Sequence, residues 1–208
     1  MTRAILAAAL AALTACAEPT IPQRTAAYRF DWFGQVFRWP AERVPVRYFA
    51  DPRGAMPRLV GDAVAHWERQ FLYGEFDGVA VTDSLAADVV VRWRDTVPPD
   101  VPPDPGSPAE ACNGVTTFAI DTANAIVAPL SVTLWPFPGF TEAQVAACLE
   151  RVAVHELGHS IGLLQHSGDS TDVMWAPPLV RAPSVADRET AEVLYHTRPT
   201  IGPPPRAP

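Results

Sequence analysis

The sequence contains no lysine, and all 16 of its basic residues are arginines. We attribute this bias to codon usage rather than to mechanism. The 23 acidic residues give a formal net charge of −7 and a pI of about 5.1. A negative chain of this kind is poorly suited to a general role on nucleic acid or on anionic membrane surfaces. We therefore expect no nucleic-acid partner.

Charged residues are scarce as a class, at 19% of the chain, whereas 48% of the residues are hydrophobic. Over 208 residues this is enough apolar material for one well-buried domain with appended ends. No internal repeat is apparent. The prolines cluster at 97–108 and 199–208, so they mark a loop and a Pro-rich C-terminal tail at 199–208 rather than a disordered protein.

Long hydrophobic runs are missing, because the apolar run at 4–13 is too short to span a bilayer. It follows an early arginine and precedes small residues, which is the order of a secretory signal peptide. Residues 13–16 (Leu-Thr-Ala-Cys) resemble the lipobox of bacterial lipoproteins, in which cleavage precedes a cysteine that is then acylated. We predict a signal peptide at 1–15 and a lipid anchor on Cys16 in the bacterial cell envelope. The alternative is an ordinary signal peptide cleaved near Ala17 and a secreted protein.

Cysteine is also rare, with three residues in the chain. If Cys16 is acylated, Cys112 and Cys148 are the remaining pair, and an oxidising compartment would let them form a disulfide. Two unpaired buried thiols are the alternative, since the sequence does not fix the distance between them. We favour the disulfide.

Residues 16–43 are expected to hold the anchor, a polar linker and an aromatic segment. The aromatic side chains lie at 30–33 and 36–39, and they could form a hairpin or a layer over the core. A membrane-touching or ligand-binding patch is the alternative, and we favour core cover.

The remaining chain shows a regular order of elements. Alternating or β-branched runs predict five strands, at 44–50, 79–82, 88–93, 114–120 and 126–135. Apolar stripes and capping boxes predict three helices, at 57–71, 141–161 and 184–195. Val89–Val91 is apolar enough to be a buried central strand. This order predicts an α+β fold with a mixed twisted sheet and helices packed on it.

The Pro-rich loop at 95–111 carries four acids, Asp95, Asp100, Asp104 and Glu110. These acids could bind Ca²⁺, but they lack the regular ligand spacing of a calcium loop. We expect a solvated surface loop, and a structural Ca²⁺ has no support from the sequence.

The chemistry is concentrated in one stretch of the sequence. His155 and His159 lie one helical turn apart on one face, so two imidazoles can hold one metal ion, and Glu156 between them can reach a water molecule. Gly162 can leave the helix and turn the chain back, which would bring in His166 as a third ligand. Three of the five histidines fall within twelve residues, which argues against incidental histidines on a solvent-facing helix.

This stretch resembles the metzincin clan of zinc endopeptidases, and within it the matrixin-like peptidases. The clan pattern is His-Glu-x-x-His-x-x-Gly-x-x-His followed by a Met-turn, and here it falls on His155, Glu156, His159, Gly162, His166 and Met174. The resemblance is strongest over 153–174. It implies a metzincin-like (zincin) catalytic domain at 44–198, with an active-site helix and a C-terminal helix.

The pattern departs from the clan at the third ligand. The usual spacing places that ligand at Gln165, and His166 comes one residue late. We predict that the turn after Gly162 is extended by one residue, because imidazole is a better zinc ligand than a neutral amide. Asp169 and Asp172 are weaker candidates, and Asp172 is expected either to tie the turn together or to accept a hydrogen bond from a ligand histidine.

The resemblance also implies roles for other residues. Three neutral imidazoles would leave Zn²⁺ an open position, with Met174 as an apolar floor and Glu156 as the base that takes a proton from a metal-activated water. The strand at 114–120 would be the edge of the cleft and would bind an extended peptide by strand addition. The substrate-binding residues would be Gly114, Val115, Thr116, Thr117 and Phe118. A Cys112–Cys148 bridge would tie this edge to the active-site helix.

The sequence thus predicts an exported, monomeric zinc endopeptidase that acts on peptides or proteins and meets the membrane only through its lipid anchor. The alternatives are a non-catalytic zinc-containing surface or binding protein on the same fold, and a hydrolase of cell-wall peptides. Retention of Glu156 argues against the first, because a structural zinc site needs no base.

Overall fold

The computed structural model describes residues 24–99 and 110–203 of the chain. The predicted signal peptide at 1–15 and the lipidation residue Cys16 lie outside these ranges, so both stay predictions. Among the described residues, none of the helices combines the length and the apolar character needed to cross a bilayer.

The Pro-rich loop is described only at its two ends. Asp100 and Asp104 lie outside the described residues. Asp95 forms an exposed ion pair with Arg53, with Nη2 and Oδ1 3.1 Å apart. The carboxylate of Asp95 therefore has a guanidinium partner.

The five predicted strands form one mixed sheet. They are β1 (Val46–Ala50), β2 (Gly78–Val81), β3 (Val89–Trp93), β4 (Cys112–Ile120) and β5 (Ile126–Pro136). Their order in space is β2-β1-β3-β5-β4, with β4 antiparallel to β5 and the other pairs parallel. β3 is the middle strand, and its residues Val89–Val91 are buried, as predicted. β4 is an edge strand, with β5 as its one neighbour in the sheet.

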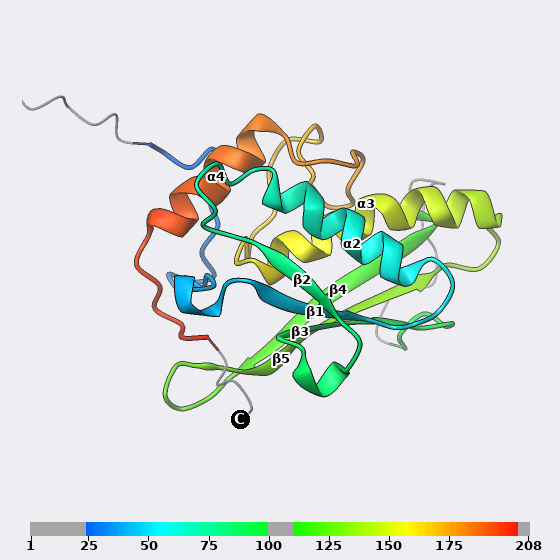
Figure 1. Cartoon of the computed structure of the whole chain (residues 1–208). Coiled ribbons are helices and arrows are strands. Elements are labelled where there is room, and N and C mark those ends of the chain that lie inside the picture. Colours follow the sequence, from blue (N-terminus) through cyan, green and yellow to red (C-terminus); the bar gives the residue numbers. More distant parts are fainter. Residues whose placement is uncertain (1–23, 100–109, 204–208) are drawn as a thin grey trace, which may run out of the picture.

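The three long helices are α2 (Met56–Glu68), α3 (Glu142–Ser160) and α4 (Val185–His196). Figure 1 shows α2 and α3 side by side over one face of the sheet, with α4 near the end of α3. The Trp67 indole donates a 2.8 Å hydrogen bond to the Val154 carbonyl and joins the first two helices. Both predicted capping boxes are present, at Thr141 and at Ser184. The predicted α+β fold, with a mixed sheet and helices packed on it, is present.

The domain includes residues on both sides of the predicted limits 44–198. Phe37 and Trp39 are fully buried, so the second half of the aromatic segment covers the core as expected. The Val36 carbonyl accepts hydrogen bonds from the backbone N–H groups of Thr200 and Ile201, and Ile201 is buried as well. The limits 44–198 are therefore too narrow, because apolar side chains in the predicted linker and tail pack into the core.

The first half of the aromatic segment behaves differently. Trp32 is 45% exposed and Phe33 is 84% exposed, so these two side chains do not cover the core. Trp32 and Gln35 exchange two backbone hydrogen bonds of 2.9 and 2.8 Å, which makes residues 32–35 a tight hairpin. The sequence left a hairpin and a layer over the core as alternatives for the aromatic segment. The structure contains both, with the hairpin at 32–35 and the core layer at Phe37 and Trp39.

The disulfide between Cys112 and Cys148 is present, with Cα atoms 5.7 Å apart. It joins the first residue of β4 to α3, seven residues before His155. The edge strand is thus covalently tied to the helix that carries the metal motif, as predicted.

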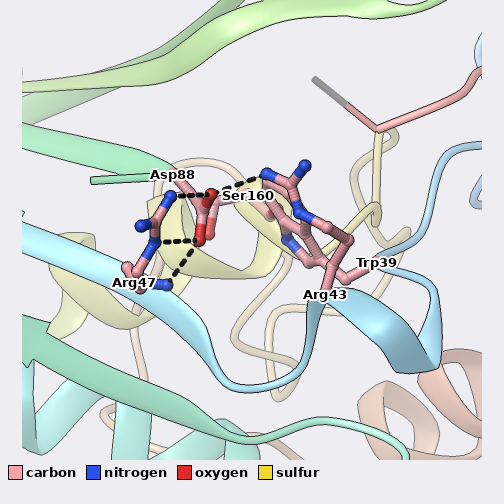
Figure 2. A network of polar contacts seen from close by, with 5 residues as sticks. All are labelled: Trp39, Arg43, Arg47, Asp88 and Ser160. Carbon is pink, nitrogen blue, oxygen red and sulfur yellow. Dashed lines mark hydrogen bonds and ion pairs between the residues drawn. The ribbon is translucent and has the colours of Figure 1, made fainter. Parts of the chain in front are cut away.

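A buried ionic network around Asp88 joins the N-terminal segment to the sheet (Figure 2). The Asp88 carboxylate accepts hydrogen bonds from the Arg43 guanidinium at 2.7 Å and from the backbone N–H of Arg47 at 2.9 Å. The Arg47 guanidinium donates two more, both at 3.1 Å. Burial of Asp88 opposes its ionisation, but the hydrogen bonds and charges of the two arginines outweigh it and lower its pKa.

The same network continues to the end of α3 (Figure 2). The Trp39 indole, which lies under the Arg43 guanidinium, donates a 2.9 Å hydrogen bond to the Ser160 carbonyl. Ser160 is the last residue of α3, so this bond satisfies a carbonyl that the helix itself leaves unpaired. The N-terminal segment is therefore anchored at the place where the chain turns toward His166.

Replacement of Asp88 by Ala should lower the free energy of unfolding by about 3 kcal/mol, because it removes the buried carboxylate to which the Arg43 and Arg47 guanidinium groups donate. Chemical unfolding of the two proteins measures this loss. The matched control is Asp95→Ala, which removes an exposed carboxylate from an arginine pair and should leave the unfolding midpoint nearly unchanged. Equal effects of the two substitutions would contradict the role of the buried network.

Candidate active site

α3 presents two imidazoles and a carboxylate within five residues. His155 and Glu156 are buried, and His159 is half-buried. The rings of His155 and His159 have centroids 4.8 Å apart, and their Nε2 atoms lie 3.2 Å apart. This proximity follows from the one-turn spacing of the two residues on a helix.

The turn after α3 depends on Gly162. Its N–H bonds the His159 carbonyl at 3.0 Å, and the N–H of Leu163 bonds the Gly158 carbonyl at 3.1 Å, which is the Schellman pattern of helix termination. Gly162 has φ +113°, and a Cβ there would overlap the carbonyl of Phe37. Both the conformation and the close approach therefore require glycine.

The extended turn brings His166 to the other two histidines. Its ring centroid lies 5.1 Å from that of His155 and 5.1 Å from that of His159. One nitrogen from each ring lies within 4.8 Å of the others, and no other such group of three metal-ligating side chains occurs in the part of the chain that the structure describes. His166 thus takes the third position of this cluster of histidines.

Backbone carbonyls orient two of the three rings. Nδ1 of His155 bonds the Val173 carbonyl at 2.8 Å, and Nδ1 of His159 bonds the Leu163 carbonyl at 2.6 Å. A carbonyl can only accept, so each Nδ1 carries the proton and each Nε2 presents a lone pair. Two lone pairs that face each other at 3.2 Å repel unless a cation lies between them. The donor set therefore fits a metal ion, and three imidazoles suit Zn²⁺.

Desolvation favours the neutral form of these rings, most strongly for His155 and His159, since the His166 side chain is exposed. Desolvation lowers the pKa of His155 to about 4, lowers that of His159 well below its usual value and also lowers that of His166. Metal ligands must be deprotonated, so at neutral pH the three rings are in the form that binds a metal.

Asp172 has a structural role in this turn. It accepts hydrogen bonds from the Ser167 hydroxyl and, at 2.6 Å, from the Ser184 hydroxyl. The expectation that it ties the turn together is confirmed. The alternative, a bond from a ligand histidine, is not present, because the Asp172 carboxylate accepts from these two hydroxyls and the Nδ1 atoms of His155 and His159 bond backbone carbonyls.

Met174 is fully buried beneath α3. A Cβ on Gly158, which lies between the two helical histidines in sequence, would overlap the Met174 sulfur, so the methionine packs directly against this part of the helix. Its carbonyl accepts a 2.9 Å bond from the N–H of Ser167, which joins the Met-turn to the residue after His166. This arrangement agrees with the apolar floor that the resemblance implies.

The sequence interpretation missed a buried carboxylate that fixes the Met-turn. Asp187 accepts a 2.8 Å hydrogen bond from the N–H of Val173, whose carbonyl holds His155. The Tyr28 hydroxyl donates a 2.7 Å bond to the same carboxylate. Asp187 is also the capping-box residue at the start of α4, and a carboxylate can accept more hydrogen bonds than a capping box supplies, which was the available clue to a further role. No feature of the sequence pointed to Tyr28.

Glu156 lies against the edge strand. The Thr116 hydroxyl is 2.7 Å from Glu156 Oε2 and 2.9 Å from the Glu156 carbonyl. Burial raises the pKa of Glu156 to about 7, and the bonds from Thr116 oppose that rise. A Cβ on Gly114 would lie 2.6 Å from Glu156 Cγ, so glycine lets the strand approach this closely.

A groove of about 580 Å³ runs beside the cluster. It is bounded by the edge strand, two of the histidines and the N-terminal hairpin; the residues are Trp32, Thr116, Thr117, Phe118, Ile120, His159, Leu164 and His166. Of the five predicted substrate-binding residues, Thr116, Thr117 and Phe118 line this groove. Gly114 packs on Glu156 instead, and Val115, which is 41% exposed, does not line it.

Comparison with known proteins gives one informative match. The family model described as Matrixin matches residues 56–187, which is more than half of the chain. A comparison with curated proteins finds no significant match. A solved structure titled "Structure of myroilysin" is similar with a TM-score of 0.40 and 11% identity, over 77% of this chain and 96% of that chain. A structural similarity at this level does not establish a shared family.

Replacement of His166 by Ala should weaken zinc binding by more than about 100-fold, because loss of a ligand costs more than loss of an outer-shell partner. Gln165→Ala is the matched control and should keep one zinc per chain. Metal content after dialysis and competition with a chelator measure both. If Gln165→Ala loses zinc and His166→Ala keeps it, the ligand assignment is wrong.

The metal-free protein should lose stability as the pH falls from about 6.5 to about 4. In this range the unfolded chain binds a proton at His155 that the folded chain does not, because the folded pKa is about 4. The contribution of this residue is about 3 kcal/mol. Urea unfolding with a chelator at pH 7 and pH 4.5 measures the loss, which should be smaller in His155→Gln. An equal loss of unfolding free energy in the wild type and in His155→Gln would contradict the assignment of this pH dependence to His155.

Proposed function

Because the chain belongs to the matrixin family of metallopeptidases, we propose that it is a zinc-dependent endopeptidase that hydrolyses peptide bonds in extended peptides or proteins. One observation carries the proposal. Three neutral imidazoles converge beside a buried carboxylate at the side of an open groove, and an edge strand bounds that groove.

His155, His159 and His166 would hold the metal through one ring nitrogen each. When bound, Zn²⁺ would supply a Lewis acid at these three residues, able to lower the pKa of a water molecule and to polarise a peptide carbonyl. The carbonyls of Val173 and Leu163 keep two of the rings in the tautomer that this requires.

Glu156 is the proposed general base. Its carboxylate is held in place by the Thr116 hydroxyl, and its pKa of about 7 lies near neutral pH. A base with such a pKa can take a proton from water and then release it to the leaving amine nitrogen. Burial excludes competing solvent around this proton transfer, which is consistent with a catalytic rather than a structural carboxylate.

β4 is the proposed binding site for the substrate backbone. As an edge strand it can pair with an extended peptide through main-chain hydrogen bonds. Thr116, which touches Glu156, is the middle residue of Cys112–Ile120, so the strand extends on both sides of the reacting position. This placement supports cleavage inside a chain rather than at its end.

We also propose that the protein is exported and anchored through Cys16. The Cys112–Cys148 disulfide supports export, because such bonds form and persist in oxidising compartments. A lipid anchor would hold the domain at the cell envelope, where peptides of the cell wall are a second class of substrate with the same bond chemistry.

Substitution of Glu156 by Gln should abolish the base and keep the metal. Cleavage of a peptide library should fall by about 10²- to 10⁴-fold, the range for loss of general acid–base catalysis. Zinc content should stay at one per chain in both proteins.

The rival is a non-catalytic zinc-containing binding protein. If the wild type and Glu156→Gln both hold zinc and neither cleaves any peptide, this rival is the correct description. If the variant cleaves as fast as the wild type, Glu156 is not the base.

A further inference from the structure

The hairpin at 32–35 has a defined backbone conformation that local hydrogen bonds stabilise. Phe33 and Gly34 both have positive φ, at +49° and +81°, which is the backbone of a two-residue hairpin turn. A positive φ is rare for a bulky residue such as Phe33, so other contacts of the hairpin must stabilise this backbone conformation. Asp31 contributes, because its carboxylate accepts a 2.6 Å bond from the Gly34 N–H and pairs with Arg29.

The hairpin is fixed directly to the turn that carries His166. The Phe30 carbonyl accepts a 2.9 Å hydrogen bond from the N–H of Leu164, and the Phe37 carbonyl lies against Gly162. These contacts flank the hairpin on both sides in sequence. Its position relative to the metal cluster is therefore set by the same turn that places the third histidine.

The hairpin also lies outside the region that matches the family, which begins at residue 56. Trp32 is the residue that reaches the groove.

Trp32 leaves nearly half of its surface open, whereas Phe37 and Trp39 in the same segment are fully buried. Its indole lines the groove together with Phe118, Ile120 and Leu164, so three separate segments contribute apolar side chains to the groove. The polar lining groups are hydroxyls and imidazoles, and the described lining includes no carboxylate, guanidinium or ammonium group. An uncharged, bulky apolar side chain fits such a surface.

The register along β4 gives the place of that side chain in the substrate. Thr116 touches Glu156 and marks the reacting position, and Phe118 lies two residues further along the strand. A peptide paired with the regular part of β4, up to Thr117, advances by the same rise per residue, and the register of β4 against β5 shifts between Thr117 and Ala119. The side chain that reaches Trp32 and Phe118 therefore belongs to a residue about two positions from the cleaved bond.

We propose that Trp32 is a specificity-determining residue, which selects substrates with a large apolar side chain about two residues from the cleaved bond. This inference rests on the proposed peptidase function for its setting. Loss of one wall of the subsite should lower the selectivity by about tenfold.

The test compares peptides of one sequence that carry Leu, Phe or Ala at the positions two residues from the cleaved bond, on either side. The zinc-loaded full-length protein and its variants Trp32→Ala, Trp32→Phe and Tyr73→Ala are assayed for kcat/KM. Tyr73 is a matched control, because it is an aromatic side chain that is 80% exposed and does not line the groove. Thermal unfolding confirms that each variant is folded.

We expect Trp32→Ala to lower kcat/KM for the Leu and Phe peptides by about tenfold and to change the Ala peptide less than about twofold. Trp32→Phe should restore part of the preference, and Tyr73→Ala should match the wild type. An equal effect of Trp32→Ala on all three peptides, or none, would overturn the proposal.

A binding measurement separates this inference from the proposed function. The affinities of zinc-loaded Glu156→Gln for the Leu and Ala peptides are compared with those of the same protein carrying Trp32→Ala. A preference for the Leu peptide that disappears with Trp32 supports the subsite, even if the wild type cleaves nothing and the peptidase proposal fails. If the protein binds the Leu and Ala peptides equally well, or binds neither peptide, the proposed subsite is wrong.

Discussion

The close approach of Gly162 to the Phe37 carbonyl constrains the whole site. It allows α3 to end where it does, and the turn that follows places His166 opposite the two helical histidines. The Leu163 carbonyl, freed by the same turn, is the group that orients His159. The contact between Gly162 and the Phe37 carbonyl is therefore linked both to the position of His166 and to the orientation of the His159 ring.

Much of the site could be predicted because it depends on local geometry. The helical spacing of His155 and His159 places them on one face, and the capping boxes at Thr141 and Ser184 begin their helices as predicted. The edge position of 114–120 came from the family resemblance, and the topology of the sheet confirms it. These features depend on neighbours within a few residues or on a pattern shared by a family.

The remainder depends on contacts between distant parts of the chain. The Tyr28 hydroxyl donates a hydrogen bond to Asp187, which lies 159 residues away in the sequence. Neither residue type indicates the other as its partner. The acceptors for the ligand histidines are backbone carbonyls, which every residue possesses, so the side chain of Asp172 was a plausible but wrong candidate. Aromatic content alone could not show that Trp39 is buried while Trp32 faces the groove, because only the packed chain distinguishes the two.

The pairing of Val36 with Thr200 and Ile201 has a consequence for the order of folding. The segment that braces the metal-binding turn lies near the start of the domain in sequence, whereas its partners around residues 187–201 lie near its end. Sheet pairing and the helix over it can form first, but the turn cannot gain its full set of contacts until residues 187–201 have joined the fold. The metal site is therefore expected to be among the last parts of the molecule to become ordered, which delays catalytic competence until the surrounding chain is folded.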